Sequence, residues 1–442
     1  MRLKNKFGLN TAISIVIANM VGTGIFTSLG FQVISLKSGF ALLLLWLLGG
    51  ISALTGALAY SELGTSMPRS GGEYHFLSKI YHPALGFIAG WVSFIIGFAA
   101  PTAAAAIALG AYFTAALNLN LTFLTFGLDK IIALSVIIFL TALHASDKTA
   151  GAWFQNIFTF LKVIALLVLI VLGLFSGINQ TLDFSVTRDS LLEITSPAFA
   201  VSLFFVSYSY SGWNAAAYIA GEIKNPEKNI PRSLLTGTLI VTFLYVFTTY
   251  VFLRVIPIQE MTGKIEIGYI FGSQIFGNHT STIMGLIFSL LLLSTVSSMI
   301  ITGPRVTHVM GEDYAILKWF SGKSKKDIPV RAIIIQAALS MGYILTSTFE
   351  QVITLIGFTL NLFTLLTVIG MMLNRRKLPD SAFIYRVKLY PVIPIIFILI
   401  NAWIIIYGLI YRPVESLAGI GISLAGLIFY LIDRSYKRKT NI

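Results

Sequence analysis

The first candidate for chemistry is a pair of glycines, Gly22 and Gly24, at the centre of an apolar segment long enough to cross a membrane. Glycine disfavours the helix by about 1 kcal/mol per position relative to alanine, so the pair predicts a break in the helix. Non-helical backbone within the membrane is tolerated only where it lines a cavity enclosed by protein, because lipid offers no hydrogen-bond partners. Close helix packing through small residues is the alternative. A second predicted interruption, at residues 209–212, favours a binding site.

The free backbone groups at the first break would suit a molecule that carries both charges. The N–H groups of Thr23, Gly24 and Ile25 would open a half-helix, whose positive end attracts a carboxylate. The carbonyl groups of Met20 and Val21 would close the preceding half-helix, whose negative end attracts an ammonium group. One break therefore offers a partner to each charge of an α-amino acid zwitterion.

The second break would add carbonyl groups from Tyr208 and Ser209 and N–H groups from Gly212 onward. Aromatic side chains surround it, and Tyr208 and Trp213 could either gate a site or simply pack. Asn214 follows on the same helix and is a candidate supporting residue. The predicted substrate-binding set is Met20, Val21, Gly22, Thr23, Gly24, Ile25, Tyr208, Ser209 and Gly212.

Lys162 lies within one apolar segment, and Glu62 lies near the cytoplasmic end of another. Lys162 would lie roughly 16 Å into a helix that starts near residue 151, at 1.5 Å per residue, and so near the bilayer midplane. A charge there should face the protein interior and have partners, and Gln155 and Thr159 would share its polar stripe. Burial disfavours the charged ammonium group, so Lys162 could release and take up a proton during transport. The alternative is a shifted helix register that places Lys162 at the cytoplasmic interface. Glu62 is predicted to be a structural partner for loop or helix-end donors.

Composition identifies an integral membrane protein. Of 442 residues, 56% are hydrophobic and only 11% are charged, which exceeds what a soluble core requires. The absence of cysteine excludes disulfides and thiolate metal sites, and the scattered histidines have no metal-binding spacing. Neither a cofactor nor a metal is therefore expected. The net charge of +13 is concentrated in alternate loops, which indicates membrane topology and not a nucleic-acid partner.

Hydropathy predicts an all-α protein with twelve transmembrane helices in a lipid bilayer, the cell (cytoplasmic) membrane. Lysine and arginine place the N- and C-termini in the cytoplasm. The approximate spans are 9–34 (broken), 40–63, 84–116, 130–147, 151–176, 197–221 (broken), 233–256, 280–304, 331–348, 351–373, 391–411 and 416–433.

The two broken spans are the first and the sixth, so they are five spans apart. An odd number of spans per unit gives the second unit an inverted topology, as in transporters whose site lies between discontinuous helices. We therefore predict a first inverted repeat over 1–182, a second over 183–374, and two additional helices with a basic cytoplasmic tail over 375–442.

Four motifs now resemble one family, the amino acid–polyamine–organocation (APC) transporters. Gly22-Thr23-Gly24-Ile25-Phe26 resembles its first-helix G-[ST]-G-[IV]-F motif. The other three are Tyr60-Ser61-Glu62-Leu63-Gly64 with 67–74, Ser211-Gly212-Trp213-Asn214 with 221–232, and Gly303-Pro304-Arg305-Val306.

The resemblance implies a LeuT-like five-plus-five inverted repeat and transport of amino acids or their derivatives. It implies that Thr23 and Gly24 bind the substrate carboxylate, and that carbonyls of Met20, Tyr208 and Ser209 bind the amine. Tyr208 matches a gating aromatic. Lys162 matches a fifth-helix lysine that replaces a sodium site. Some relatives have a disulfide-linked glycoprotein partner, which a chain without cysteine cannot form.

The predicted function is a permease, a secondary active transporter of amino acids that works by alternating access. We expect sodium independence, with proton-coupled symport or amino acid exchange. The alternatives are a sodium-coupled symporter and a transporter of amines or polyamines on the same fold. A channel is a further rival, and a membrane enzyme lacks support because no intramembrane His/Asp/Glu cluster is present.

Overall fold

The computed structural model describes residues 7–119, 122–123, 126–146, 148–180, 182–324, 326, 328–377, 379 and 384–440. Within these ranges, the side chains of 122–123, 126, 148–156, 159, 278–281 and 438–440 are not described. The predicted supporting residues Gln155 and Thr159 therefore lie outside the described side chains.

The described chain is helical apart from one two-stranded antiparallel hairpin. Its first part contains α1 (Leu9–Met20), α2 (Gly24–Thr27), α3 (Leu29–Ser35), α4 (Gly39–Ser66), α5 (Glu73–Ile80), α6 (Pro83–Val92), the π-helical η1 (Ser93–Phe98), α7 (Ala99–Ala116), β1 (Thr122–Phe123), β2 (Phe126–Gly127), α8 (Leu128–Ser146) and α9 (Lys148–Phe175).

The second part contains α10 (Arg188–Ile194), α11 (Pro197–Tyr210), α12 (Ala215–Tyr218), the short η2 (Ala220–Glu222), α13 (Pro226–Val255), α14 (Ile258–Met261), α15 (Ile267–Phe276), α16 (Asn278–Asp313), the 3₁₀ segment η3 (Ala315–Ser321), α17 (Val330–Thr346) and α18 (Phe349–Lys377). The chain ends with α19 (Val392–Tyr411) and α20 (Pro413–Thr440).

Nine helices of the described chain are long and apolar enough to cross a membrane, or ten if the bent pair α10 and α11 is one span. Shorter apolar helices cover 160–175, 267–276 and 330–346. The protein is therefore a multi-pass membrane protein, and the exact number of twelve spans stays a prediction.

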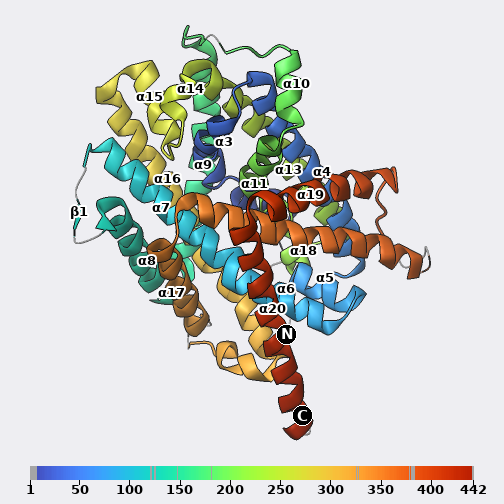
Figure 1. Ribbon diagram of the computed structural model, residues 1–442. Coiled ribbons are helices and arrows are strands. Elements are labelled where there is room, and N and C mark those ends of the chain that lie inside the picture. The colour runs from blue at the N-terminus through green and yellow to red at the C-terminus, as the bar shows by residue number, and fades with distance from the viewer. Residues whose placement is uncertain are drawn as a thin grey trace.

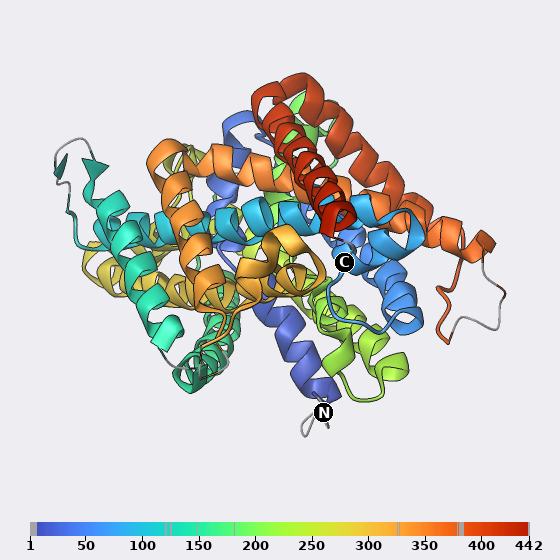
Figure 2. The same cartoon turned by 90° about the horizontal axis from the view of Figure 1, so that it is seen from below.

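The core of the helical body is built from small and apolar side chains. In α7 the run Ala103–Ala106 is completely buried, and α7 packs along α16. Lipid tails are as apolar as the helix surfaces, so no hydrophobic driving force brings two helices together in a membrane. Small residues let the helices approach closely, and the van der Waals contacts between them then stabilise the pair. Helices α10, α14 and α15 lie at one end of the molecule and the C-terminal part of α20 at the other (Figure 1). Seen from below, α8 lies toward one edge and the C-terminal end of α18 at the opposite edge (Figure 2).

Among the expected boundaries, the end of the eighth span differs most from the structure. The span predicted over 280–304 continues as α16 to Asp313, with Pro304 inside the helix. Proline removes a helical hydrogen bond, which is why the sequence predicts an end there. The following turns remain helical because Met310 is buried in a cluster with Tyr74, Phe87, Tyr314 and Leu317.

Candidate functional site

The first break lies between α1 and α2. Helix α1 ends at Met20 and α2 begins at Gly24, so residues 21–23 leave the helical path. The first N–H groups of a helix have no partner within it, so α2 presents free donors at Thr23, Gly24 and Ile25. Thr23 itself is 1% exposed. The break therefore lies inside the protein body.

The second break lies two residues later than the sequence predicts. Helix α11 continues to Tyr210, and α12 starts at Ala215. The chain turns at Gly212, whose φ of +98° is a conformation that glycine adopts and other residues avoid. A Cβ on Gly212 would lie 2.8 Å from the carbonyl oxygen of Asn19. The second break therefore packs directly against the end of α1.

Side chains also join the two breaks. The hydroxyls of Thr23 and Tyr208 are 2.7 Å apart and hydrogen-bonded, and Ser28 Oγ lies 3.1 Å from Ser209 Oγ. A Cβ on Gly24 would lie 2.5 Å from Ser209 Cα. Close packing of α2 on α11 therefore requires glycine at position 24, whatever else that residue binds.

The carbonyl ends of α1 and α11 share one hydroxyl group. Tyr245 Oη, on α13, lies 2.5 Å from the carbonyl oxygen of Met20 and 3.1 Å from that of Ser209. The carbonyl of Tyr208 accepts the N–H of Ser211 at 3.0 Å. The predicted ammonium acceptors Met20 and Ser209 thus converge, and sequence reasoning missed the tyrosine that bridges them.

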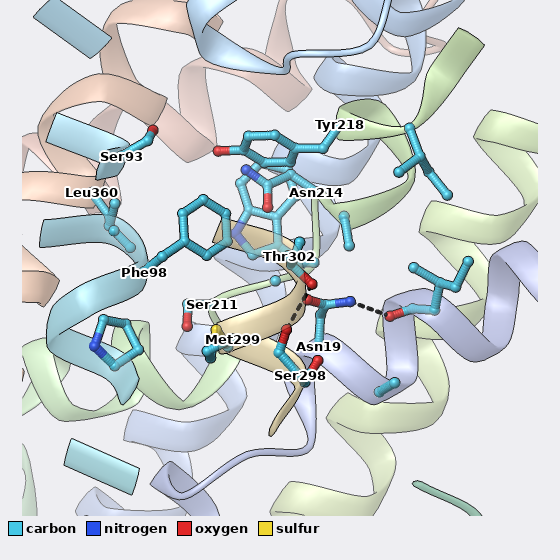
Figure 3. Close-up of a pocket in the computed structure, with 18 of the residues that line it drawn as sticks. Asn19, Ser93, Phe98, Ser211, Asn214, Tyr218, Ser298, Met299, Thr302 and Leu360 are labelled. Carbon is cyan, nitrogen blue, oxygen red and sulfur yellow. Dashed lines mark hydrogen bonds between the residues drawn. The ribbon is translucent and has the colours of Figure 1, made fainter. Parts of the chain in front are cut away.

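A cavity of about 680 Å³ lies next to the breaks. Gly212, Trp213 and Asn214 line it, whereas residues 20–25, Tyr208 and Ser209 are not among its lining residues. The side chains of Asn19, Ser298 and Thr302 gather on one side, and Asn214 lies beside Tyr218 (Figure 3). Its lining continues along α1 to Phe7, Asn10 and Thr11, near the N-terminus. The cavity therefore connects the second break with the end of the molecule that carries the N-terminus.

Trp213 and Asn214 make different contacts at this cavity. The Trp213 ring packs edge-on against Tyr60 at 4.8 Å and Phe397 at 6.0 Å between centroids. The amide of Asn214 donates to Glu73 Oε1 at 2.7 Å. Asn214 therefore connects the second break to α5, a contact that the sequence did not predict.

Lys162 faces the protein interior. It is 1% exposed, and its Nζ donates to Thr295 Oγ1 on α16 at 2.7 Å. A Cβ on Gly22 would lie 3.5 Å from Thr295 Cγ2. Thr295 therefore stands between Lys162 and the first break. Sequence reasoning missed this partner, whose only signal is a run of polar residues in an apolar helix.

Glu62 is completely buried, and both of its carboxylate oxygens accept hydrogen bonds. Arg375 Nε donates to its Oε1 at 2.6 Å, and the N–H of Val387 donates to its Oε2 at 2.8 Å. The guanidinium group of Arg375 also lies over the ring of Tyr390 at 4.1 Å. This pair ties α4 to α18 and to the segment that follows α18.

No group of three or more acidic or histidine side chains suited to a metal ion occurs in the part of the chain that the structure describes.

The family model described as amino acid permease matches residues 7–432. The chain is 29% identical to the serine/threonine exchanger SteT of Bacillus subtilis, over 97% of this chain and 96% of that protein. It is 28% identical to the b(0,+)-type amino acid transporter 1 of Mus musculus, over 98% and 89% of the two chains. It is 27% identical to the human large neutral amino acids transporter small subunit 2, over 99% and 82%. The chain thus belongs to the amino acid permease family, within the APC transporters, and is a transporter and not an enzyme.

Proposed function

We propose that the protein exchanges amino acids across the cytoplasmic membrane by alternating access, without sodium. Proton-coupled symport is the second candidate. The observation that carries the proposal is the buried Lys162–Thr295 contact beside the first break. A fixed cation between the two halves of the molecule can link the two repeats, which is the role of a bound sodium ion in sodium-coupled transporters. Exchange is favoured because one of the relatives is a serine/threonine exchanger.

The substrate would bind at the paired breaks. The N–H groups of Thr23 and Gly24 would hold the carboxylate, because they open α2 at its positive end. The carbonyls of Met20 and Ser209 would accept the ammonium group in place of the Tyr245 hydroxyl. The hydrogen bond between Tyr208 and Thr23 supports Tyr208 as a gate, and a gating role of Trp213 stays a prediction.

The proposed architecture is the twelve-span, LeuT-like inverted repeat, with repeats 1–182 and 183–374 and two further helices. Its support is that the two breaks touch although Thr23 and Tyr208 are 185 residues apart. Both termini would lie in the cytoplasm, because the positive charges flank that side. The cavity would then open to the cytoplasm.

Amines and polyamines are weaker candidates as substrates. They lack a carboxylate, so the N–H groups of α2 would lose hydrogen-bonding partners that a buried site requires. A methyl ester or N-acetyl derivative of a transported amino acid should therefore compete poorly for uptake. Equal competition by the ester would remove the carboxylate site at α2.

The function is tested with purified protein in liposomes, using a panel of labelled L-amino acids with and without internal amino acid. We expect uptake that requires internal substrate and that is unchanged when sodium is replaced by potassium or choline. A strict sodium requirement would restore sodium-coupled symport. Uptake driven by an inward proton gradient without internal substrate would favour proton symport.

A further inference from the structure

A second hollow, an apolar groove of about 370 Å³, lies on the outside of the helical body between α9 and α13. Its volume falls within the range of ligand sites, about 300–1,000 Å³. The side chains that line it are all aliphatic or aromatic, and they are Val163, Leu167, Leu239, Ile240, Phe243 and Leu244. Leu239 and Phe243 are 50% and 57% exposed, whereas Leu244 is buried. The groove therefore suits a hydrocarbon chain and offers no partner to a polar solute.

The exposed face of α13 continues from the groove to two cations. At about 100° per residue, positions 228, 232, 239 and 243 fall within about 60° of one another around the helix. The residues at these positions are Lys228, Arg232, Leu239 and Phe243. Both cations are exposed, and neither makes an ion pair among the described residues. Like charges four residues apart repel each other, so the pair favours an anion that contacts both.

Nearby acidic side chains do not neutralise this face. Residues 222–232 contain the acids Glu222 and Glu227 and the cations Lys224, Lys228 and Arg232. Glu222 lies before α13, in η2. Glu227 is displaced by about 100° around the helix from Lys228. The face of α13 above the groove is therefore positively charged.

We propose that the groove and the two cations together bind one anionic phospholipid, with an acyl chain between α9 and α13 and the phosphate at Lys228 and Arg232. A guanidinium group binds phosphate through paired, charge-assisted hydrogen bonds. Arg232 precedes Leu239 by about 10 Å along the helix. The headgroup region of one leaflet is roughly 5–8 Å thick, so a phosphate within reach of Arg232 places the acyl chain beside Leu239.

The proposed orientation of the protein supports this choice of lipid. It places the start of α13 on the cytoplasmic side, and clustered basic residues at that surface attract anionic lipids. The inference goes beyond the proposed function, because it concerns a lipid and does not depend on which solute is transported.

The groove adjoins the larger cavity through α9. Val163 lines both spaces, and it follows Lys162 directly in the chain. On another face of α13, a Cβ on Gly237 would lie 2.7 Å from Val16 Cγ1, so α13 packs tightly against α1. A lipid in the groove therefore contacts the outer surface of helices that also form the wall and the surroundings of the cavity. We expect the bound lipid to stabilise this packing.

The test measures lipid binding to the purified protein in detergent by native mass spectrometry. The probes are phosphatidylglycerol, which is anionic, and phosphatidylcholine with the same acyl chains, which is zwitterionic. Phosphatidylglycerol should bind more tightly and raise the thermal midpoint more. Combining Lys228→Gln with Arg232→Gln should weaken phosphatidylglycerol binding about 25-fold, at about fivefold per cation. Phosphatidylcholine binding should change little in this variant. Glycerol 3-phosphate, which has the phosphate and no acyl chain, should leave the midpoint unchanged.

Two further variants separate a defined site from general attraction to a basic surface. Ile240→Trp places a larger ring in the groove and should weaken the binding of both lipids. Arg434→Gln is the matched control, because Arg434 is an exposed arginine of α20 that does not line the groove. Phosphatidylglycerol binding should be unchanged in this control.

Equal affinity of the wild type for the two lipids overturns the proposal, even if a variant does not fold. Equal losses in Arg434→Gln and Arg232→Gln also overturn it, because the attraction would then be diffuse. Wild-type binding of phosphatidylglycerol in Ile240→Trp excludes the groove as the site. These experiments measure no transport, so their failure would leave the proposed function untouched.

Discussion

The contact between Lys162 and Thr295 offers a quantitative test of the coupling role. Lys162 has one hydrogen bond among the described residues, from Nζ to Thr295 Oγ1 at 2.7 Å. Thr295→Val keeps the shape of the side chain and removes that acceptor. Lys162→Met removes the charge and keeps most of the length. The two variants therefore perturb opposite ends of one interaction.

The magnitude follows from the environment of the lysine. A hydrogen bond to a charged group contributes about 1.5–3 kcal/mol, and Lys162 is 1% exposed, so water cannot replace the lost acceptor. At about 1.4 kcal/mol per factor of ten, Thr295→Val should slow exchange roughly 10- to 150-fold if the contact is needed during transport. In a Lys162→Met background the same substitution should have little effect, because no ammonium is left to bind.

The assay is exchange of a labelled amino acid in liposomes, with the thermal midpoint of each purified variant as a control for folding. We expect a coupling energy of about 1.5–3 kcal/mol between the two positions in the double-mutant cycle. Near-normal exchange in Lys162→Met would refute the reasoning, because the ammonium would then be dispensable. Additive effects of the two substitutions would refute it as well.

Three further results are expected. Gly24→Ala should lower the thermal midpoint by the equivalent of about 1–3 kcal/mol, because the new methyl would lie 2.5 Å from Ser209 Cα; an unchanged midpoint would contradict the tight packing of α2 on α11. Arg375→Gln should cost about 3–5 kcal/mol in unfolding free energy by leaving Glu62 buried without its cation, and adding Glu62→Gln should recover part of it. Burial, helped by nearby cations, lowers the pKa of His75 on α5 to about 4. Its contribution to stability is therefore present above about pH 6.5 and is lost as the pH falls toward 4; midpoints measured against pH should decline less in His75→Gln.

The sequence predicts features that depend on one stretch of chain. Gly22 and Gly24 interrupt an apolar run, so the end of α1 at Met20 and the start of α2 follow from helix propensity alone. Lys162 lies far inside a single apolar segment, so its burial follows from the cost of a charge in lipid. Neither inference needs knowledge of a neighbouring helix.

Features that depend on two or more helices could not be predicted. Tyr245 and Thr295 reach the site from segments with no distinguishing spacing, and Glu73 from a motif that assigns it no role there. Their contacts arise only from packing. The second break is displaced for a related reason. Ser209 and Tyr210 can remain helical, and the turn occurs at Gly212, where the backbone of α1 leaves no room for a side chain.

The breaks are tightly packed on the side of α14 and α15 and open on the side of the N-terminus. This difference indicates which contacts would have to break or form during transport. Toward α14 and α15 the path is closed: a Cβ on Gly30 would lie 2.0 Å from the carbonyl oxygen of Lys264, and the N–H of Gly263 donates to Gly30 at 2.8 Å. Tyr112 adds a bridge there, since its hydroxyl donates to the carbonyl of Phe26 at 2.7 Å and accepts the N–H of Gly268 at 2.8 Å. Toward the N-terminus the cavity is open. Under the proposed alternating access, we expect α2 and α3 to separate from these backbone partners to open the closed side, and α1 and α12 to move to close the cavity. Since residues 21–23 separate α1 from α2, the proposed mechanism would allow the two movements to occur in turn, as alternating access demands.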